Sequence, residues 1–307
     1  MISLIDTINV PILIIAFNRP DISMKTFDLI GKSKPSKIYI AVDGPRDGKI
    51  GEFELVEQVK KIYSNPSWNC SLFTKFSDIN KGAEVSVSEA VSWVLSIEEN
   101  VIVLEDDVLA PYSFLKFAQD MLNRYANNEN IYQISGAQFT PMISMNEDYT
   151  FSFYGHTGCG WATFRRAWCK FNLSISDFDN FLNHNNLHNQ FATKRQRDSF
   201  IKGVIKMKQL GPGHSSWDRC WSYIKVKNNG LSIVPKVNLT RNIGFYGLHG
   251  DGEKDFQKLS YDENFEALNH PELVDCNKKY DLYHFNNYIY HSLYSKIVYK
   301  IKKIFHI

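Results

Sequence analysis

Short apolar runs alternate with amphipathic segments over about the first 130 residues, and this pattern constrains the fold most strongly. Residues 10–17 form an uninterrupted apolar run, which is typical of a strand buried on both faces. Strands are predicted at residues 10–17, 37–43, 71–76 and 101–104, and helices from about 20 to 30, at 52–63, from 82 to about 95, and at 112–125. Such alternation builds a parallel sheet wrapped by helices, so the predicted fold class is α/β.

The second half of the chain is less regular. Its predicted elements are two strands and one helix, at residues 131–135, 231–234 and 217–227. An aromatic, glycine-rich stretch (150–167) and a polar, basic stretch (178–208) lie between them. No repeat or linker divides the chain, which predicts one large domain to about residue 255 with a C-terminal extension.

Composition narrows the class of protein. Hydrophobic residues make up 44% of the chain and charged residues 22%, which suits a large core and argues against extended disorder. A formal net charge of +2 is too small to predict nucleic-acid binding. The five cysteines form no CxxC pair, which indicates reduced thiols in a cytoplasmic protein.

No membrane-crossing segment is predicted, because no stretch reaches the ~18 apolar residues that a membrane helix needs, and Asp6 interrupts the first apolar residues. Residues 290–307 mix apolar residues with four lysines. That composition suits either an interfacial helix on the anionic inner face of the cell membrane or a packing helix with a basic outer face. The basic stretch 194–208 leaves a similar choice between a solvated helix face and a site for an anionic acceptor or lipid.

Three adjacent carboxylates, Glu105, Asp106 and Asp107, follow the fourth predicted strand. Their mutual repulsion needs compensation, and a divalent cation such as Mg²⁺ or Mn²⁺ on a diphosphate is the usual agent. A solvated acidic turn explains the same residues, so the triplet alone leaves both interpretations open. Its position favours a site, because ligands of parallel α/β sheets bind beyond the carboxyl ends of the strands.

Other polar residues follow the neighbouring elements and should gather at the same edge of the sheet. Asn18 and Arg19 follow the first strand, where an arginine can pair with phosphate or stack on a base. Asp43 follows the second strand and can accept from a base or ribose, although an Asp-Gly turn is more common. Gly82 opens a helix whose N-terminus can receive phosphate, although such a glycine more often marks a turn.

Two motifs in the second half also suit a sugar site. Gly160-Trp161 combines close backbone approach with a flat indole that packs well on a sugar, or else forms a tight turn with a core tryptophan. Asp218 follows Trp217 near a helix start, where it can act as a general base or as a helix cap. His249 can contact a metal or a phosphate, although a lone histidine is more often structural.

In combination these motifs resemble those of nucleotide-sugar glycosyltransferases of the GT-A fold. The matching motifs are PILIIAFNRP (11–20), AVDGP (41–45), NKG (80–82), VLEDD (103–107), GWATFRRAW (160–168), WD (217–218), NGLSIVP (229–235) and NIGF (242–245). The resemblance covers about residues 10 to 250. It is closer to bacterial surface-glycan sugar transferases, a set that includes hemolysin-like proteins, than to the animal enzyme that adds the first N-acetylglucosamine to complex N-glycans.

The resemblance implies a GT-A domain over residues 1–255, with a nucleotide-binding half (1–135), a half for donor sugar and acceptor (136–255), and an extension (256–307). It implies Mn²⁺ or Mg²⁺ as cofactor, a nucleotide sugar as partner with a UDP-sugar favoured, and a glycan or lipid-linked glycan as acceptor. The implied reaction is an inverting hexosyl or N-acetylhexosaminyl transfer to a hydroxyl, in surface polysaccharide or glycoconjugate synthesis.

The same resemblance implies a role for each site residue. Asp107, the last acid of a DxD-like motif, looks like the metal ligand, and Asp218 looks like the base that deprotonates the acceptor. The implied donor contacts are Asn18, Arg19, Asp43, Gly82, Glu105, Asp106, Gly160, Trp161, Trp217 and His249. Residues 242–251 resemble a loop that orders over bound donor. The chain departs from the animal enzyme at Arg219, where that enzyme has a second aspartate, which puts the acceptor contacts in doubt.

Two alternative functions stay open. A nucleotidyltransferase acting on sugar phosphates also uses a doubly wound sheet and a metal, but it usually has a glycine-rich basic loop after the first strand. Residues 17–20 lack glycine. A non-enzymatic carbohydrate-binding module is the other alternative, and the acidic triplet argues against it.

Overall fold

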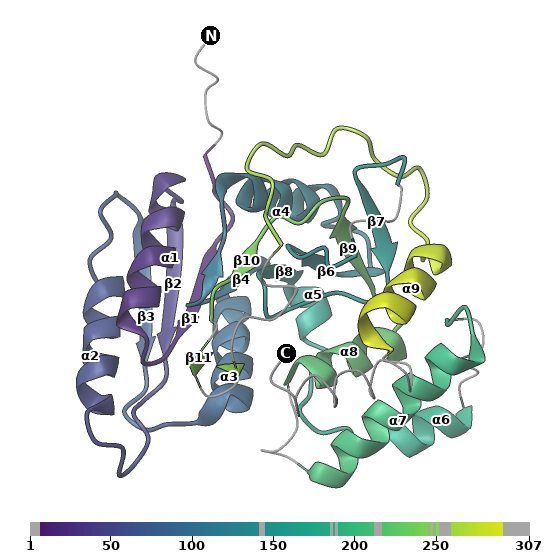
Figure 1. The fold of residues 1–307 in the computed structure, drawn as a ribbon, viewed down its shortest axis with the longest axis horizontal. Coiled ribbons are helices and arrows are strands. Elements are labelled where there is room, and N and C mark those ends of the chain that lie inside the picture. The colour runs from purple at the N-terminus through teal and green to yellow at the C-terminus, as the bar shows by residue number, and fades with distance from the viewer. Residues whose placement is uncertain are drawn as a thin grey trace, which may run out of the picture.

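The computed structural model describes residues 7–140, 145–184, 187, 190–211, 217–244, 246–247, 250–251 and 259–290. An eight-stranded sheet forms its centre, in the order β3-β2-β1-β4-β8-β6-β9-β7 (Figure 1). The strands are β1 (Ile12–Ala16), β2 (Lys37–Val42), β3 (Ser71–Phe76), β4 (Asn100–Glu105), β6 (Ile131–Ser135), β7 (Tyr149–Ser152), β8 (Trp161–Phe164) and β9 (Leu231–Pro235).

The sheet is mostly parallel. β3, β2, β1 and β4 run in one direction, and within this sheet only β8 and β7 oppose their neighbours. The predicted α/β class with a mostly parallel sheet flanked by helices is therefore confirmed, and it is consistent with a Rossmann-like GT-A fold.

Four helices connect the strands of the first half, as the alternation of patterns predicts. They are α1 (Pro20–Lys32), α2 (Glu52–Tyr63), α3 (Gly82–Ile97) and α4 (Tyr112–Arg124). The chain moves from β1 outward to β3, and α3 then returns it past β1 to β4. Because such crossovers are right-handed, α1 and α2 cover one face of the sheet and α3 the other. The carboxyl ends of β1 and β4 thus flank the point where the strand order reverses, the usual ligand site of such sheets.

The core follows from the apolar runs of the sequence. Every residue of β1 is buried, and so is every residue of β2 after the first. On α3, Val87, Val91 and Val94 repeat at helical spacing and are all buried against the sheet. The first half is therefore a rigid platform for the residues that follow its strands.

The second half contains elements that the sequence patterns did not predict. The remaining elements are β5 (Val108–Leu109), α5 (Arg165–Trp168), α6 (Phe178–His184), α7 (Lys194–Leu210), α8 (Trp217–Lys227), β10 (Arg241–Asn242), β11 (Tyr246–Gly247), β12 (Gly250–Asp251), α9 (Lys278–His284) and the π-helix η3 (Phe285–Ile289). Of these, α8 matches the predicted helix at 217–227. β7 and β8 arise from the aromatic stretch, and β8 lies antiparallel between β4 and β6. The insertion of β8 brings the glycine-tryptophan motif beside β4.

The described part of the predicted C-terminal extension packs on the same sheet. The Asp281 carboxylate accepts from Phe153 N at 3.2 Å and from Ser152 Oγ, which joins α9 to β7. Tyr280 and Phe285 are buried. A division of the chain at residue 255 stays a prediction, and the basic tail 291–307 lies outside the described residues.

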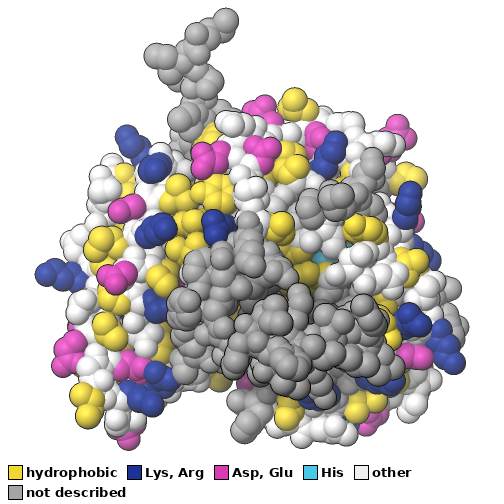
Figure 2. Space-filling view, viewed as in Figure 1, with side chains coloured by type: hydrophobic (Ala, Val, Ile, Leu, Met, Phe, Trp, Pro, Cys, Tyr) yellow, Lys and Arg dark blue, Asp and Glu magenta, His cyan; other side chains and the backbone are white. Residues whose placement is uncertain are grey.

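The surface carries no dominant charge on the face that is drawn. Figure 2 shows acidic and basic side chains interspersed over this face, in keeping with the net charge of +2. None of the helices in the described ranges has the length and apolar character needed to cross a membrane.

Lys225 on α8 lies inside the core of the second half. Its side chain is 1% exposed, and Nζ donates to Gln133 Oε1 at 3.0 Å and to Ser232 Oγ at 2.7 Å. Burial lowers the pKa of Lys225 from its ordinary 10.5 to about 7. Between these two pH values the folded chain holds fewer protons than the unfolded chain.

The free energy of unfolding should therefore rise with pH between about 7 and 10.5 through this group. The slope from one fully released proton is about 1.4 kcal/mol per pH unit. Urea unfolding across this window measures it, and Lys225→Met, which cannot titrate, is the control. The difference in unfolding free energy between wild type and Lys225→Met should change with pH, and a constant difference would contradict the prediction.

Candidate active site

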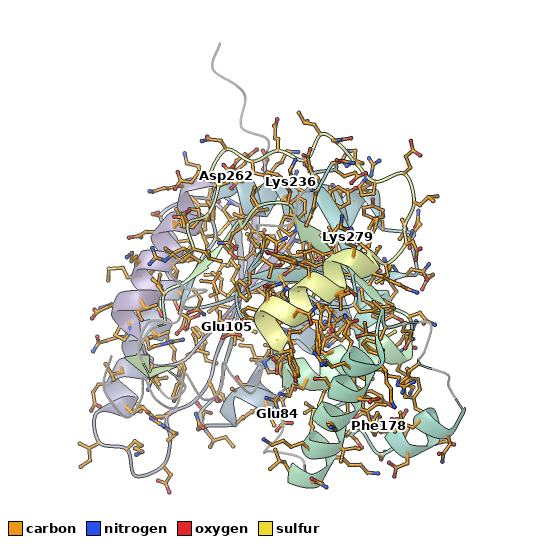
Figure 3. All side chains as sticks on the ribbon, turned by 45° about the vertical axis from the view of Figure 1, so that its right-hand side comes forward. Glu84, Glu105, Phe178, Lys236, Asp262 and Lys279 are labelled. Atoms are coloured by element: carbon orange, nitrogen blue, oxygen red, sulfur yellow. The ribbon has the colours of Figure 1, made fainter. Side chains whose placement is uncertain are left out.

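The acidic triplet lies where β4 ends beside β1. Ile15 of β1 is in register with Glu105, and Asp106 N donates to Ile15 O at 2.9 Å. Phe17 N, directly after β1, donates to Asp106 Oδ2 at 3.4 Å. In Figure 3, Glu105 lies near the middle of the molecule. The predicted gathering of polar strand ends therefore occurs for β1 and β4, at the point where the strand order reverses.

Arg19 supplies positive charge to this acidic strand end. Its Nη1 donates to Asp107 Oδ2 at 3.0 Å, and its Nη2 pairs with Asp106 Oδ1. The two aspartates are buried, whereas Arg19 is partly exposed. The sequence suggested a base or phosphate contact for Arg19, and the structure pairs it with two of the three acids. The Arg19 guanidinium thus offsets part of the mutual repulsion of the three carboxylates.

One guanidinium does not neutralise three carboxylates. Burial, together with the negative charges of Asp107 and Asp106, raises the pKa of Glu105 to about 8, against the opposing effect of Arg19. Burial also raises the pKa of Asp106 to about 6, against the opposing effect of Arg19. The pKa of Asp107 is raised by burial as well. The strand end therefore disfavours three negative charges together and favours any additional positive charge.

Glu105 connects this strand end to the second half of the chain. Its half-buried carboxyl group makes no hydrogen bond within the described part of the chain. The charge of Asp218 contributes to the raised pKa of Glu105, so the two carboxylates lie within electrostatic reach of one another. Residues far apart in sequence, on β4 and α8, thus face the same region.

Aromatic packing positions Asp218. Trp161 begins β8 in register with Val103 of β4, and its ring stacks on Trp217 with centroids 5.5 Å apart. This stacking holds the first turn of α8 near the end of β4. Asp218 Oδ1 accepts from Arg219 N at 2.9 Å, and burial raises the pKa of Asp218. Trp161 and Trp217 are both buried core residues here, and a donor contact for either stays a prediction.

Gly160 is required by the packing at the same place. Its φ is +78°, and a Cβ there would lie 3.2 Å from Leu104 Cδ2 and 3.3 Å from Phe114 Cε1. The close backbone approach that the sequence suggested is thus an approach to the core beneath β4. Any sugar contact by Gly160 stays a prediction.

A further contact to Asp107 comes from β10 and the residues that follow it. Asn242 Nδ2 donates to Asp107 Oδ1 at 2.9 Å and to Gly158 O at 3.0 Å. A Cβ on Gly244 would lie 2.1 Å from Asp107 Oδ2, so only glycine fits in this arrangement. The sequence motif at 242–245 signalled this segment but not its direct contact with Asp107. His249 lies outside the described residues.

Asp43 holds the start of α3. Its carboxylate accepts from the backbone N–H of Gly44 (3.0 Å), Lys81 (3.0 Å) and Gly82 (3.1 Å), and from Asn80 Nδ2 (3.1 Å). Four donors use all the lone-pair positions of a carboxylate. The N–H of Gly82, considered for phosphate, is likewise bonded to Asp43. In this structure Asp43 and Gly82 bond to each other at the start of α3. A contact of either residue with a nucleotide stays a prediction.

Replacing Asp43 with alanine should lower the free energy of unfolding by about 2–4 kcal/mol, because one buried and three partly buried donors lose their acceptor. Urea unfolding measures the loss. Asp43→Asn keeps the volume and one acceptor oxygen, and should lose less. A loss below about 1 kcal/mol for the alanine variant would contradict this role.

Asn18 joins a different network. Its Nδ2 donates to Glu52 Oε1 at 2.9 Å, and Glu52 also accepts from Arg46 N at 2.7 Å. The hydrogen bonds from Arg46 lower the pKa of Glu52 to about 2. The Asn18–Glu52–Arg46 network fixes the loops after β1 and β2, and the sequence did not reveal it.

The residues at Asp107 fit a divalent cation. Its carboxylate oxygens are hard donors, and each accepts one hydrogen bond, from Asn242 or Arg19, which leaves a lone pair on each. In the described ranges no three acidic, histidine or cysteine side chains are grouped around a single metal position. One carboxylate with ligand phosphates and water is nevertheless a common way to hold Mg²⁺.

Comparison with known proteins gives only distant likeness. No protein-family model matches the sequence, and no curated protein sequence matches it. One similar solved structure is 4-diphosphocytidyl-2C-methyl-D-erythritol synthase from Anaerococcus prevotii, with TM-score 0.34 and 11% identity over 64% of this chain and 83% of that chain. Another is the mannosyltransferase PcManGT from Pyrobaculum calidifontis in complex with GDP-Man and Mn²⁺, with TM-score 0.33 and 13% identity over 75% of this chain and 57% of that chain.

A third similar structure is a UDP-glucose pyrophosphorylase complexed with UDP-glucose, with TM-score 0.35 and 8% identity over 74% of this chain and 90% of that chain. Likeness of this extent does not distinguish sugar transfer from nucleotidyl transfer. The function of this chain must be argued from its own side chains.

Proposed function

We propose that the protein is a metal-dependent glycosyltransferase that moves a sugar from a nucleotide-diphosphate sugar to a glycan hydroxyl with inversion. The observation that carries the proposal is the Trp161–Trp217 stack, which holds the first turn of α8, with Asp218, near the acidic end of β4 at the point where the strand order of the sheet reverses. That point is where α/β sheets bind nucleotides. The Asp218 carboxylate near this point can accept a proton from the acceptor hydroxyl.

Each acidic residue then has a separate role. Asp107 would hold Mn²⁺ or Mg²⁺, which would supply positive charge for the departing nucleoside diphosphate. Arg19 holds Asp106 and Asp107 in place through its two ion pairs. Glu105, with no partner in the described part of the chain, can bond a hydroxyl of the donor. The other donor contacts proposed from the sequence are Asn18, Arg19, Asp43, Gly82, Asp106, Gly160, Trp161, Trp217 and His249.

Asp218 accepts the proton in the transfer step. The acceptor oxygen forms a bond to C1 of the sugar, the bond from C1 to the diphosphate oxygen breaks, and the hydroxyl proton moves to the carboxylate. Burial raises the pKa of Asp218, which makes its carboxylate a stronger base than a solvated one. A single in-line displacement inverts the configuration at C1.

The biological setting is proposed from the sequence alone. We infer a UDP-sugar as donor and a glycan or lipid-linked glycan as acceptor, in the synthesis of bacterial surface polysaccharide or glycoconjugate. The enzyme would act in the cytoplasm, with peripheral contact to the membrane through its basic C-terminal residues. Lysines in that segment suit attraction to anionic lipid.

Calorimetric titration with UDP, with and without Mn²⁺, tests the proposal. The expected result is binding that depends on Mn²⁺. Absence of nucleotide binding would instead favour a carbohydrate-binding module. Consumption of a nucleoside triphosphate together with a sugar phosphate would favour a nucleotidyltransferase.

A further inference from the structure

A cavity of about 830 Å³ lies between α7 and the end of η3. Lys194, Arg195, Asp198, Ser199 and Lys202 of α7 line it, and Tyr290 lies opposite. The volume is in the range of small-molecule sites, roughly 300–1,000 Å³. None of these residues belongs to the acidic strand end or contacts it, so the cavity is a separate feature of the molecule.

The lining carries an excess of positive charge. It contains three cationic side chains and one carboxylate. That carboxylate, Asp198, already forms an ion pair from its Oδ1 to Arg197 Nη2 at 3.2 Å. Within the described part of the chain, Lys194, Arg195 and Lys202 have no ion-pair partner. Their spacing places them on one side of α7, whereas Gln196, Val204 and Met207 are buried on the other.

Lys194 and Arg195 lie in the first turn of α7, where positive side-chain charge is least favourable. α7 begins after Thr193 in a full capping box, and its first turn contains no acidic residue. The positive end of a helix dipole favours anions and disfavours the side-chain charges of Lys194 and Arg195. An anion in the cavity would be attracted by both the side chains and the helix end. Such a locally unfavourable arrangement is typical of functional sites.

The opposite wall suits an organic ligand. The Arg195 guanidinium lies over the Tyr290 ring, with its carbon 4.9 Å from the ring centroid. This contact orients the guanidinium, and a planar guanidinium binds phosphate oxygens in pairs. Ile289 adds apolar surface beside Tyr290.

We propose that this cavity binds the phosphate or diphosphate group of an organic phosphoester. Arg195 provides a paired donor, Lys194 and Lys202 provide ammonium groups, and Ser199 provides a hydroxyl. The same chemistry belongs to an anionic lipid headgroup and to a soluble organic phosphate. The site does not depend on the proposed sugar transfer, because it uses none of the residues assigned to that reaction.

Calorimetry of the full-length chain with inorganic diphosphate, in buffer that contains a metal chelator, tests the proposal. Without a divalent ion the carboxylates at β4 repel the probe, so binding reports on the cavity. Lys202→Glu is compared with Lys206→Glu, an exposed lysine one turn further along α7 that does not line the cavity. We expect about tenfold weaker binding for Lys202→Glu, and less than about twofold for Lys206→Glu.

No binding by the wild type, or equal losses in the two variants, would overturn the proposal. Arg195→Gln, with folding checked by circular dichroism, gives an independent test of the same prediction. Vesicles of phosphatidylcholine with and without phosphatidylglycerol identify the source of the phosphate. If Lys202→Glu weakens vesicle binding more than Lys206→Glu does, the ligand is a headgroup. If only diphosphate binding differs between the two variants, the ligand is soluble.

Discussion

Replacement of Asp218 with asparagine is expected to abolish sugar transfer while donor binding stays nearly unchanged. The amide keeps the shape of the side chain but cannot accept the proton of the acceptor hydroxyl. General-base catalysis contributes about 10²–10⁴-fold, and turnover should fall by that factor. The metal and diphosphate are assigned to Asp107, so the affinity for the donor should change little.

Turnover is measured as release of nucleoside diphosphate, and donor affinity by calorimetry. Asp47→Asn, at an exposed position, is the matched control and should behave as wild type. Because burial raises the pKa of Asp218, wild-type activity should decline as the pH falls through that raised pKa. Wild-type turnover by Asp218→Asn would rule out Asp218 as the base.

Replacement of Asp107 with alanine is expected to remove metal-dependent donor binding. Asp107 is the acid whose two oxygens each retain a lone pair beside Arg19 and Asn242. A metal ion stabilises bound phosphate by several kcal/mol, so the affinity for UDP with Mn²⁺ should fall about a hundredfold or more. Binding measured without Mn²⁺ should change far less.

Glu105→Gln is the matched control for Asp107→Ala, because it replaces a neighbouring carboxyl group without removing the proposed ligand. It should retain the Mn²⁺ dependence of UDP binding with a smaller loss of affinity. We expect both variants to fold, because Arg19 keeps its ion pair with Asp106 when Asp107 is lost. Circular dichroism checks this expectation. If Asp107→Ala binds UDP with the Mn²⁺ dependence of wild type, Asp107 is not the metal ligand.

The parts of the fold that were predictable depend on local pattern. Continuous apolar runs gave β1, β2 and β4, because a strand buried on both faces needs apolar residues throughout. The rule for strand carboxyl ends then predicted that Arg19 and the acidic triplet would meet, as they do.

The parts that were not predictable depend on distant partners. β7 and β8 have four residues each, and their strand character comes from neighbours in the sheet rather than from alternation in their own sequence. The ion pairs of Arg19 and the use of Asp43 by the start of α3 depend on side-chain geometry that spacing alone does not reveal. Residue types at strand ends thus predicted that these charged residues meet but not the partner of each charge.

A panel of nucleotide sugars, incubated with the wild-type chain with and without Mn²⁺ and a mixture of glycan acceptors, tests the central claim most directly. The predicted result is release of nucleoside diphosphate from one donor, dependent on Mn²⁺ and lost in Asp218→Asn. Release that persists in Asp218→Asn, or no release from any donor that binds with Mn²⁺, would contradict the claim that Asp218 and the acidic end of β4 form a glycosyltransferase site.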